Sequence, residues 1–253
     1  MSRIIGILNY KGGTGKTTTV VNLGAGLALT GKRVLCIDLD AQGSLASYFG
    51  KRYSYSMTDL IIGEVLPDRC IIKARENLDF IPSDRTVLQA AGHIWRLNDD
   101  LAARRVLPER LYGLTGYDYI IVDYSPSVSL LSEGGLLYVQ ELIVPVAMNH
   151  LSVLGFQQVS KTLKEVGRTP EHRVRLSLIV PTFYYGRLRK DRAIIQVLKR
   201  YFPNIIADPI RTNVKLAEAP GRRKTIFEYA PRSYGAVDYA KLVEKVVSLE
   251  QEG

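Results

Sequence analysis

Residues 11–18 read Lys11-Gly12-Gly13-Thr14-Gly15-Lys16-Thr17-Thr18 and come directly after a short apolar run, Ile4–Asn9. Glycines let the backbone turn tightly so that its N–H groups point at an anion, and the positive end of a helix that follows adds to that field. The pattern predicts such a helix over Lys16–Thr30, ended by a C-capping Gly31. We therefore predict a phosphate-binding loop between a strand and a helix.

The residue types in this loop fit a nucleoside triphosphate with Mg²⁺. Lys16 is expected to reach the β- and γ-phosphates, the Thr17 hydroxyl to ligate Mg²⁺, and Thr18 to hydrogen-bond an α-phosphate oxygen. The general pattern G-x-x-x-x-G-K-[ST] is not met in its ordinary form, because Asn9 or Tyr10 stands where a glycine is expected. A dinucleotide fingerprint fails too, because Thr18 takes the place of its third glycine.

Lys11 is a second lysine, at the point where the chain leaves the strand. Since Lys16 already serves the γ-phosphate, an extra ammonium is free to act on the nucleotide of a partner, as a cation supplied in trans stabilises a transferring phosphoryl group. The alternative is an exposed lysine near a loop, with no catalytic part.

Strands and helices alternate along the rest of the chain. Runs rich in Ile, Val and Leu predict buried strands at Ile4–Asn9, Val34–Asp38, Leu78–Pro82, Tyr119–Asp123, Leu142–Val146, Leu176–Pro181 and Ile205–Ile210. Further helices are expected over Asp191–Phe202 and Tyr234–Leu249. This order predicts an α/β fold with a doubly wound, mostly parallel sheet and helices on both faces. No repeat or linker marks a boundary, so we expect a single domain over residues 1–253.

Three carboxylates follow predicted strands, at the edge where such folds bind their ligands. Asp38 and Asp40 stand at alternate positions and can lean toward the phosphate loop together, where a carboxylate orients the attacking water or holds Mg²⁺. Asp123 ends the apolar run Tyr119–Asp123, as in a Walker B motif, and is a candidate Mg²⁺ contact. Considered alone, Asp123 before Ser125-Pro126 also fits a helix cap.

Composition excludes several other classes of protein. The chain of 253 residues, 46% apolar and 23% charged, can bury a full core, and its only cysteines, Cys36 and Cys70, favour a reducing compartment and buried thiols. It has no apolar run long enough to span a bilayer and no signal peptide, so we expect a cytoplasmic protein. The three histidines, His93, His150 and His172, are too scattered for a metal site.

The positive charge is concentrated in one segment. Residues 161–232 hold 17 Lys and Arg against 6 Asp and Glu, whereas the rest of the chain is slightly acidic. This favours nonspecific binding of double-stranded DNA through phosphate contacts, and the alternative is a generally basic surface. The candidate DNA-binding residues are Arg187, Arg189, Lys190, Lys215, Arg222 and Arg223. No helix-turn-helix precedes the phosphate loop, so operator binding is not expected.

Three ordered motifs resemble those of the ParA/MinD ATPases. Residues 11–18 are similar to their deviant Walker A motif, Asp38-Leu39-Asp40-Ala41-Gln42 to their next motif, and Asn213-Val214-Lys215-Leu216-Ala217-Glu218-Ala219-Pro220 to the short, Soj-like ParA branch. The match spans nearly the whole chain and implies a P-loop NTPase fold of the deviant Walker A type.

The resemblance also implies an activity and its partners. It implies a homodimer that encloses two ATP molecules, with Lys11 of each subunit on the other's nucleotide, Asp40 most tied to hydrolysis and Asp38 beside it. Pro181, Thr182 and Asn213 are placed near adenine only by this resemblance. The ATP-bound dimer would bind the nucleoid, and a ParB-like or cargo-adaptor protein would stimulate hydrolysis and release it. The cargo would be a plasmid, a chromosome or a protein body such as a carboxysome, as for McdA-like proteins.

The sequence departs from the family pattern at two positions, and two other functions remain as alternatives to a DNA-binding ATPase. Ala41 and Ser125 stand where the family usually has proline, which bears on the rigidity of the loops around the site but removes no carboxylate. A MinD-like membrane-associated regulator would need a basic amphipathic helix at the carboxyl end, whereas the last residues, 246–253, are acidic and short. A ligase of the dethiobiotin synthetase type would need neither Lys11 nor the basic segment.

Overall fold

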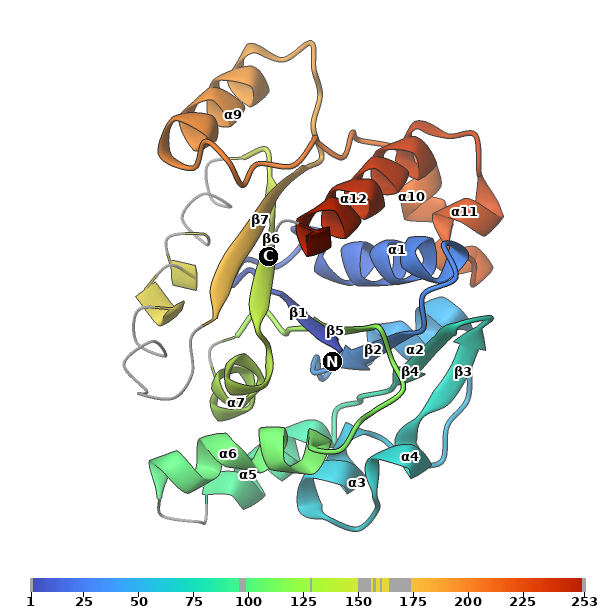
Figure 1. The fold of residues 1–253 in the computed structure, drawn as a ribbon, viewed down its shortest axis with the longest axis vertical. Helices are drawn as coiled ribbons and strands as arrows, with labels where there is room; N and C mark the ends of the chain where they lie inside the picture. Colours follow the sequence, from blue (N-terminus) through green and yellow to red (C-terminus); the bar gives the residue numbers. More distant parts are fainter. Residues whose placement is uncertain are drawn as a thin grey trace.

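The computed structural model describes residues 2–95, 99–127, 129–149, 156, 158–159, 161–163 and 174–251. Within them, seven strands form one sheet: β1 (Arg3–Ile7), β2 (Val34–Asp38), β3 (Ile72–Arg75), β4 (Leu78–Ile81), β5 (Tyr119–Asp123), β6 (Glu141–Ala147) and β7 (Arg175–Thr182). The strand order is β3-β4-β2-β5-β1-β6-β7, and every neighbouring pair is parallel except β3 and β4. The predicted doubly wound, mostly parallel sheet is confirmed (Figure 1).

Helices cover both faces of this sheet. The helices described are α1 (Lys16–Leu29), α2 (Ser44–Phe49), α3 (Met57–Ile62), α4 (Pro67–Cys70), α5 (Val87–Trp95), α6 (Asp100–Leu111), α7 (Leu130–Tyr138), α9 (Arg189–Tyr201), α10 (Val214–Glu218), the 3₁₀ turn η1 (Pro220–Arg222), α11 (Ile226–Tyr229) and α12 (Tyr234–Gln251). Figure 1 shows α1, α11 and α12 on one side of the sheet and α5, α6 and α7 on the other.

Alternate residues of each strand enter two separate cores. On β2, Val34 and Cys36 pack with α1 and α12, whereas Leu35 and Ile37 pack with the α3, α5 and α6 layer. Successive side chains of a strand point to opposite faces, so a strand covered on both faces is apolar throughout. The continuous apolar runs seen in the sequence follow from this double coverage.

Helix α1 lies unusually close to its neighbours because two of its residues lack a side chain. A Cβ added to Gly26 would lie 2.4 Å from Cγ2 of Val243 in α12, and one added to Gly24 would lie 2.8 Å from Sγ of Cys36 in β2. This close packing holds the helix that follows the phosphate loop against the sheet.

Two details of the strand prediction are wrong. Residues 205–210 do not form a named strand; they run beside β7 with an isolated bridge between Ile206 and Ile179, because Pro209 has no N–H with which to continue a ladder. The antiparallel edge strand β3 was not predicted, since its four residues include two charged ones, Lys73 and Arg75. The other predicted strands and the three predicted helices agree with the structure to within two residues at each end.

The cysteines and histidines are placed as follows. Cys36 and Cys70 are free and fully buried, as predicted, and burial raises the pKa of both thiols. The side chain of His93, and all of His150 and His172, lie outside the described part of the chain. No group of three or more metal-binding side chains, counting His, Cys, Asp and Glu, occurs among the residues described. Where the structure is described, none of the helices has the length and apolar character needed to cross a bilayer.

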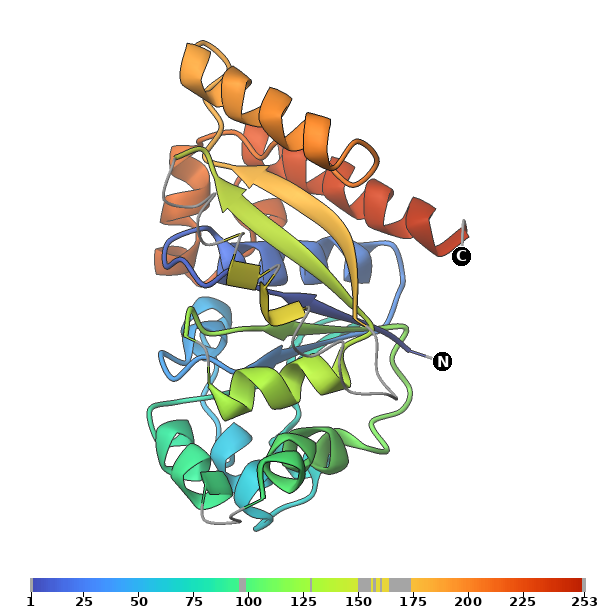
Figure 2. The same ribbon diagram turned by 90° about the vertical axis from the view of Figure 1, so that its left-hand side faces the viewer.

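Strand register brings the candidate carboxylates to one edge. Asp38 of β2 is the pairing partner of Asp123 of β5, and Ile7, the last residue of β1, pairs with Asp123 from the other side. In Figure 2 the arrowheads of β6 and β7 point toward the side that carries the loop between β1 and α1, and the end of α12 lies on the opposite side. The phosphate loop, Asp38 and Asp123 therefore share the carboxyl edge of the sheet.

Candidate nucleotide-binding site

The loop after β1 has the backbone that a phosphate-binding loop requires. Gly13 (φ 71°) and Gly15 (φ 88°) both have left-handed conformations, which glycine adopts without strain. Gly15 caps α1, and its carbonyl accepts the Thr19 amide at 2.9 Å. The first N–H groups of α1 therefore lie beside the loop, where the helix dipole favours an anion.

Asn9 shapes this loop, although in the sequence pattern it stands only where a glycine is expected. Its side chain is fully buried; Nδ2 donates to the Pro145 carbonyl of β6 at 2.8 Å, and Oδ1 accepts the Lys11 amide at 2.9 Å. The amide side chain thus ties the start of the loop to a neighbouring strand. The signal for this role was available, because asparagine at a strand end commonly hydrogen-bonds the backbone two residues on.

The two loop lysines have contrasting environments. Lys16 is buried, and burial lowers the pKa of its ammonium against the attraction of Asp123 and Asp40. Lys11 is exposed, as are Gly12 and Gly13 next to it. Lys16 therefore points into its own site, whereas Lys11 lies on the surface at the mouth of the loop.

Asp123 is a buried carboxylate with unfilled hydrogen-bonding capacity. It is fully buried, and neither oxygen has a partner that meets hydrogen-bond geometry among the described residues. Burial raises the pKa of Asp123 to about 7, while the nearby Thr17 hydroxyl and Lys16 ammonium act to lower it. Unsatisfied buried oxygens of this kind need a partner, and hard oxygen ligands beside a hydroxyl fit Mg²⁺ or its bound water.

Asp38 differs from Asp123, because its oxygens are already used. Its carboxylate accepts the Asp40 amide at 2.9 Å and the Leu45 amide at 3.0 Å, and burial together with the charge of Asp123 raises its pKa well above the usual value. Asp38 thus fixes the loop that carries Asp40 and the first turn of α2. Asp40 itself is partly exposed, and its Oδ1 accepts the Gln42 amide at 3.0 Å.

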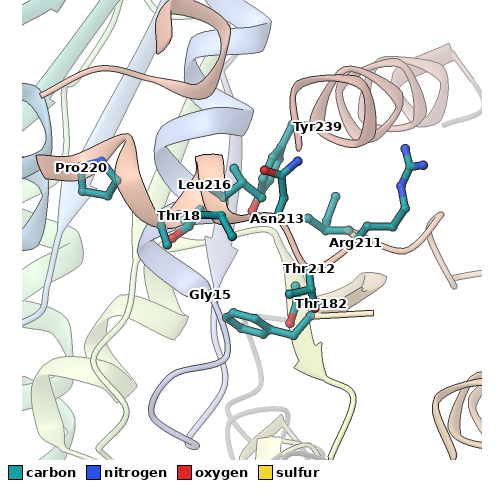
Figure 3. A pocket seen from close by; sticks show the side chains of 13 residues that line it. Gly15, Thr18, Thr182, Arg211, Thr212, Asn213, Leu216, Pro220 and Tyr239 are labelled. Atoms are coloured by element: carbon teal, nitrogen blue, oxygen red, sulfur yellow. The ribbon is translucent and has the colours of Figure 1, made fainter. Parts of the chain in front are cut away.

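A cavity of about 390 Å³ opens beside the loop, on the side of α1 and α10 (Figure 3). Gly15 and Thr18 of the phosphate-binding segment line it together with Thr182 and Asn213. The Thr182 hydroxyl donates to the Thr14 carbonyl at 2.8 Å and so joins the end of β7 to the loop. Pro181, the remaining residue assigned to adenine, lies buried in β7 and is not among the lining residues; its carbonyl accepts the Ile210 amide at 2.8 Å.

The rest of this cavity is suited to a flat, uncharged group. Leu216, Pro220 and Tyr239 supply apolar surface, and the Asn213 side chain caps α10 by accepting the Lys215 amide at 2.8 Å. Arg211 also lines the cavity, but its guanidinium turns away toward Asp238 of α12, with which it forms an ion pair at 2.5 Å (Figure 3). A mostly apolar hollow next to a phosphate loop is where a nucleotide base fits.

The two residues that depart from the expected proline pattern lie at one place. Ala41 and Ser125 line a small cavity of about 270 Å³ together with Asp40, and the Ser125 hydroxyl hydrogen-bonds that of Ser127 at 2.8 Å. Both substitutions therefore lie next to Asp40 and leave the buried carboxylates in place.

The candidate DNA-binding residues form two groups. Arg187 lies just before α9, Arg189 and Lys190 begin it, and Lys215, Arg222 and Arg223 lie on α10, η1 and the residue after it. All six are exposed. The two views agree that α9 and α10 lie apart, so within one chain these residues do not form a single patch (Figures 1 and 2).

Comparison with known proteins places this chain in a family. A model described as an AAA domain matches residues 2–176. The sporulation initiation inhibitor protein Soj of Bacillus subtilis is 35% identical, over 98% of this chain and 99% of its own. The chromosome-partitioning ATPase Soj of Thermus thermophilus is also 35% identical, over 99% and 97%. The chain belongs to the ParA/MinD family of ATPases.

Solved structures agree with this assignment. A crystal structure of cobyrinic acid a,c-diamide synthase from Mycobacterium smegmatis, with bound ATP analogue and magnesium, has a TM-score of 0.85 and 26% identity, over 100% of this chain and 97% of that one. MinD from Pyrococcus horikoshii, complexed with Mg-ADP, has a TM-score of 0.82 and 25% identity, over 99% and 98%. This member of the family is thus a ParA-type positioning ATPase whose cofactors are ATP and Mg²⁺.

The residues present fit these cofactors. Bound Mg²⁺ neutralises charge on the β- and γ-phosphates during transfer. Thr17 and the unsatisfied Asp123 would hold the ion, Asp38 would keep the neighbouring loop in place, and Lys16 would contact the terminal phosphates. Asp40, on the loop that Asp38 fixes, would be the carboxylate that orients water. A preformed loop and buried carboxylates lower the barrier through placement and electrostatics, with no strong base required.

Proposed function

We propose that this ATPase forms an ATP-dependent homodimer that binds DNA without sequence preference and positions or segregates a cargo. Partner-stimulated hydrolysis would then release it from the nucleoid. The observation that carries the proposal is the split between the two loop lysines. Lys16 is buried in its own site, and Lys11 is exposed at the carboxyl edge. An exposed ammonium at the mouth of a phosphate loop is available to a nucleotide held by a second copy.

The charges on the surface support DNA as the partner of the ATP state. Arg187, Arg189, Arg222 and Arg223 have no carboxylate within ion-pair distance in the described part of the chain. Two symmetric copies double each of the two basic groups, and phosphate contacts add with the number of cations engaged. Lys215 is expected to contribute less, because it already pairs with Glu218 at 2.8 Å.

A membrane-binding function is less consistent with the last helix. The final turn of α12 carries no basic residue, whereas binding to an anionic membrane surface requires basic residues beside an apolar face. DNA therefore fits the charge distribution better than a lipid surface does.

An electrophoretic mobility assay on long duplexes of unrelated sequence tests the proposal. We expect a shift with ATP and Mg²⁺, none with ADP, and a weakening as salt rises. The double variant Arg187→Ala/Arg189→Ala should bind roughly tenfold or more weakly, since each lost phosphate contact removes part of the counterion-release term. Lys73→Ala, an exposed cation on the edge strand β3, is the matched control and should bind as the parent does.

Equal binding in ADP and ATP would contradict the coupling between nucleotide and DNA. Equal binding by the Arg187→Ala/Arg189→Ala variant and the Lys73→Ala control would contradict the assignment of α9 to the DNA surface. ATP hydrolysis without DNA, measured on the same variants, separates loss of DNA binding from loss of the nucleotide site.

A further inference from the structure

A second cavity, of about 500 Å³, lies beside the loop that carries Asp40. It shares no lining residue with the cavity beside Gly15 and Thr18. Four segments enclose it: the loop 41–43, α2 with the residues 50–53 that follow it, the loop 83–85 after β4, and Arg223 after η1. None of the roles assigned to the nucleotide site accounts for this hollow.

Its walls carry a marked excess of positive charge. Lys51, Arg52, Arg85 and Arg223 line the cavity with a single carboxylate, Asp84. That carboxylate is engaged with neutral donors, because the Thr86 amide donates to Oδ1 at 2.9 Å and the Tyr53 hydroxyl to Oδ2 at 3.2 Å. In the described part of the chain, no carboxylate lies within ion-pair distance of any of the four cations.

Arg223 lies on this cavity because of two unusual backbone positions. Its own φ is 56°, a left-handed conformation that costs a residue with a side chain about 1–2 kcal/mol. Gly50, which ends α2, leaves room for it, since a Cβ there would lie 2.5 Å from Cδ of Arg223. The guanidinium stem thus packs across the end of α2.

A neutral group with no partner adds a second, independent observation. Ser83 lines the same cavity; it is fully buried, and its hydroxyl has no hydrogen-bond partner among the described residues. Buried hydroxyls are normally hydrogen-bonded, so this one marks an unmet requirement at the cavity wall. A phosphate oxygen accepts from both hydroxyl and guanidinium donors.

We propose that this cavity binds a small phosphorylated anion, separately from the ATP held by the phosphate loop. Arginine recognises phosphate through paired N–H donors, and a concave site of this volume is of the size that holds a small molecule. The loop 41–43 forms one wall, so the occupant contacts the segment that begins at Asp40. Arg223 is shared with the DNA-binding proposal, whereas Arg52 and Arg85 belong to neither basic group assigned to DNA, so these two arginines separate the two proposals in a test.

Calorimetric titration with inorganic pyrophosphate tests this site on the full chain saturated with ADP, at constant free Mg²⁺, so that the phosphate loop is filled. We expect saturable binding with one site per chain. The double variant Arg52→Ala/Arg85→Ala should bind at least about tenfold more weakly, because charge-assisted hydrogen bonds to phosphate are lost. Lys73→Ala and Arg187→Ala/Arg189→Ala should bind as the parent does. Unchanged ADP affinity verifies that each variant is folded.

Three outcomes would overturn the proposal. If the heat of pyrophosphate binding disappears as the ADP concentration is raised, the pyrophosphate binds in the phosphate loop. Equal affinity of the parent and the Arg52→Ala/Arg85→Ala variant would remove these arginines from the site. No pyrophosphate binding, combined with a loss of DNA binding in that variant, would assign the cavity to the DNA surface.

Discussion

At the scale of single residues, Asp38 and Asp40 show how two neighbouring carboxylates are assigned different tasks. Alternation along the chain suggested that both face the phosphate loop. In the structure both oxygens of Asp38 accept backbone amides, from Asp40 and Leu45, whereas Asp40 is partly exposed and accepts one amide, from Gln42. Asp38 is therefore the residue that holds the loop, and Asp40 is the residue that the loop presents.

This difference predicts that substituting Asp38 lowers stability, whereas substituting Asp40 lowers hydrolysis. Asp38→Ala leaves the buried Leu45 amide without an acceptor and should lower the free energy of unfolding by about 1–3 kcal/mol, somewhat offset by relief of repulsion from Asp123. Asp40→Ala should change stability by less than about 1 kcal/mol, yet abolish hydrolysis and trap an ATP-bound dimer.

Urea unfolding of the nucleotide-free protein measures the first effect, and light scattering with excess ATP measures the second. A stable Asp38→Ala protein would mean that the loop does not depend on Asp38. An Asp40→Ala protein that stays monomeric in ATP would count against the proposed part of Asp40 in hydrolysis.

At the scale of elements, one ion pair with a nearly buried carboxylate joins β1 to β6, and the same arginine reaches α12. Arg3 at the start of β1 donates from Nε and Nη2 to Glu141 at the start of β6, and from Nη1 to the Val246 carbonyl of α12 at 2.5 Å. Burial opposes the ionisation of Glu141, but the hydrogen bonds and charge of Arg3 outweigh it and lower the pKa of Glu141 below its usual value. The pair therefore connects two strands with the last helix.

This lowered pKa fixes the direction of a pH effect. A carboxylate whose pKa is lower in the folded protein stabilises it at pH values above the unfolded pKa of 4.5, and the contribution is lost as the pH falls through the folded value. Glu141→Gln should thus lower the free energy of unfolding by about 2–4 kcal/mol at pH 7, because the partly buried Arg3 is left without its anion. The difference from the parent should shrink below about pH 4.

Urea unfolding from pH 3 to pH 8 measures this dependence. Asp208→Asn, which removes the exposed pair with Lys241 at 3.6 Å, is the control and should change stability by under about 1 kcal/mol at each pH. A Glu141→Gln deficit that is the same at pH 3 and pH 7 would show that lost packing, and not the lost charge, is responsible.

The elements also show which features the sequence can predict. Strands buried on both faces and the helix after the phosphate loop were predicted because their apolar periodicity and glycines act locally. The chain at 205–210 was predicted as a strand because four of its six residues are Ile or Ala, yet Pro209 prevents a ladder. The cavity beside Gly15 depends on distant segments, Thr18, Thr182 and Asn213, whose meeting no local pattern encodes. Thr18 came from the phosphate-loop pattern, and only the resemblance to a family supplied Thr182 and Asn213.

At the scale of the whole molecule, the carboxyl edge of the sheet gathers the phosphate loop, the buried carboxylates and the exposed Lys11. Among the residues described, Lys11 contributes only backbone groups to its own loop: its amide donates to Asn9, and its carbonyl accepts the Thr14 hydroxyl at 3.4 Å. Replacing its side chain therefore leaves the loop geometry intact. Replacing the buried Lys16 removes a cation from within the site itself.

Lys11→Ala should bind ATP within about twofold of the parent but dimerise at least about tenfold more weakly, because a charge-assisted contact across the interface is lost. Lys16→Ala, the control, should lose ATP affinity outright. Equilibrium dialysis measures ATP affinity. Small-angle X-ray scattering with a nonhydrolysable analogue, over a range of protein concentrations, measures dimerisation. If Lys11→Ala dimerises as the parent does and hydrolyses ATP at the same rate, the ammonium acts on no second nucleotide, and the exposed lysine serves only as surface charge.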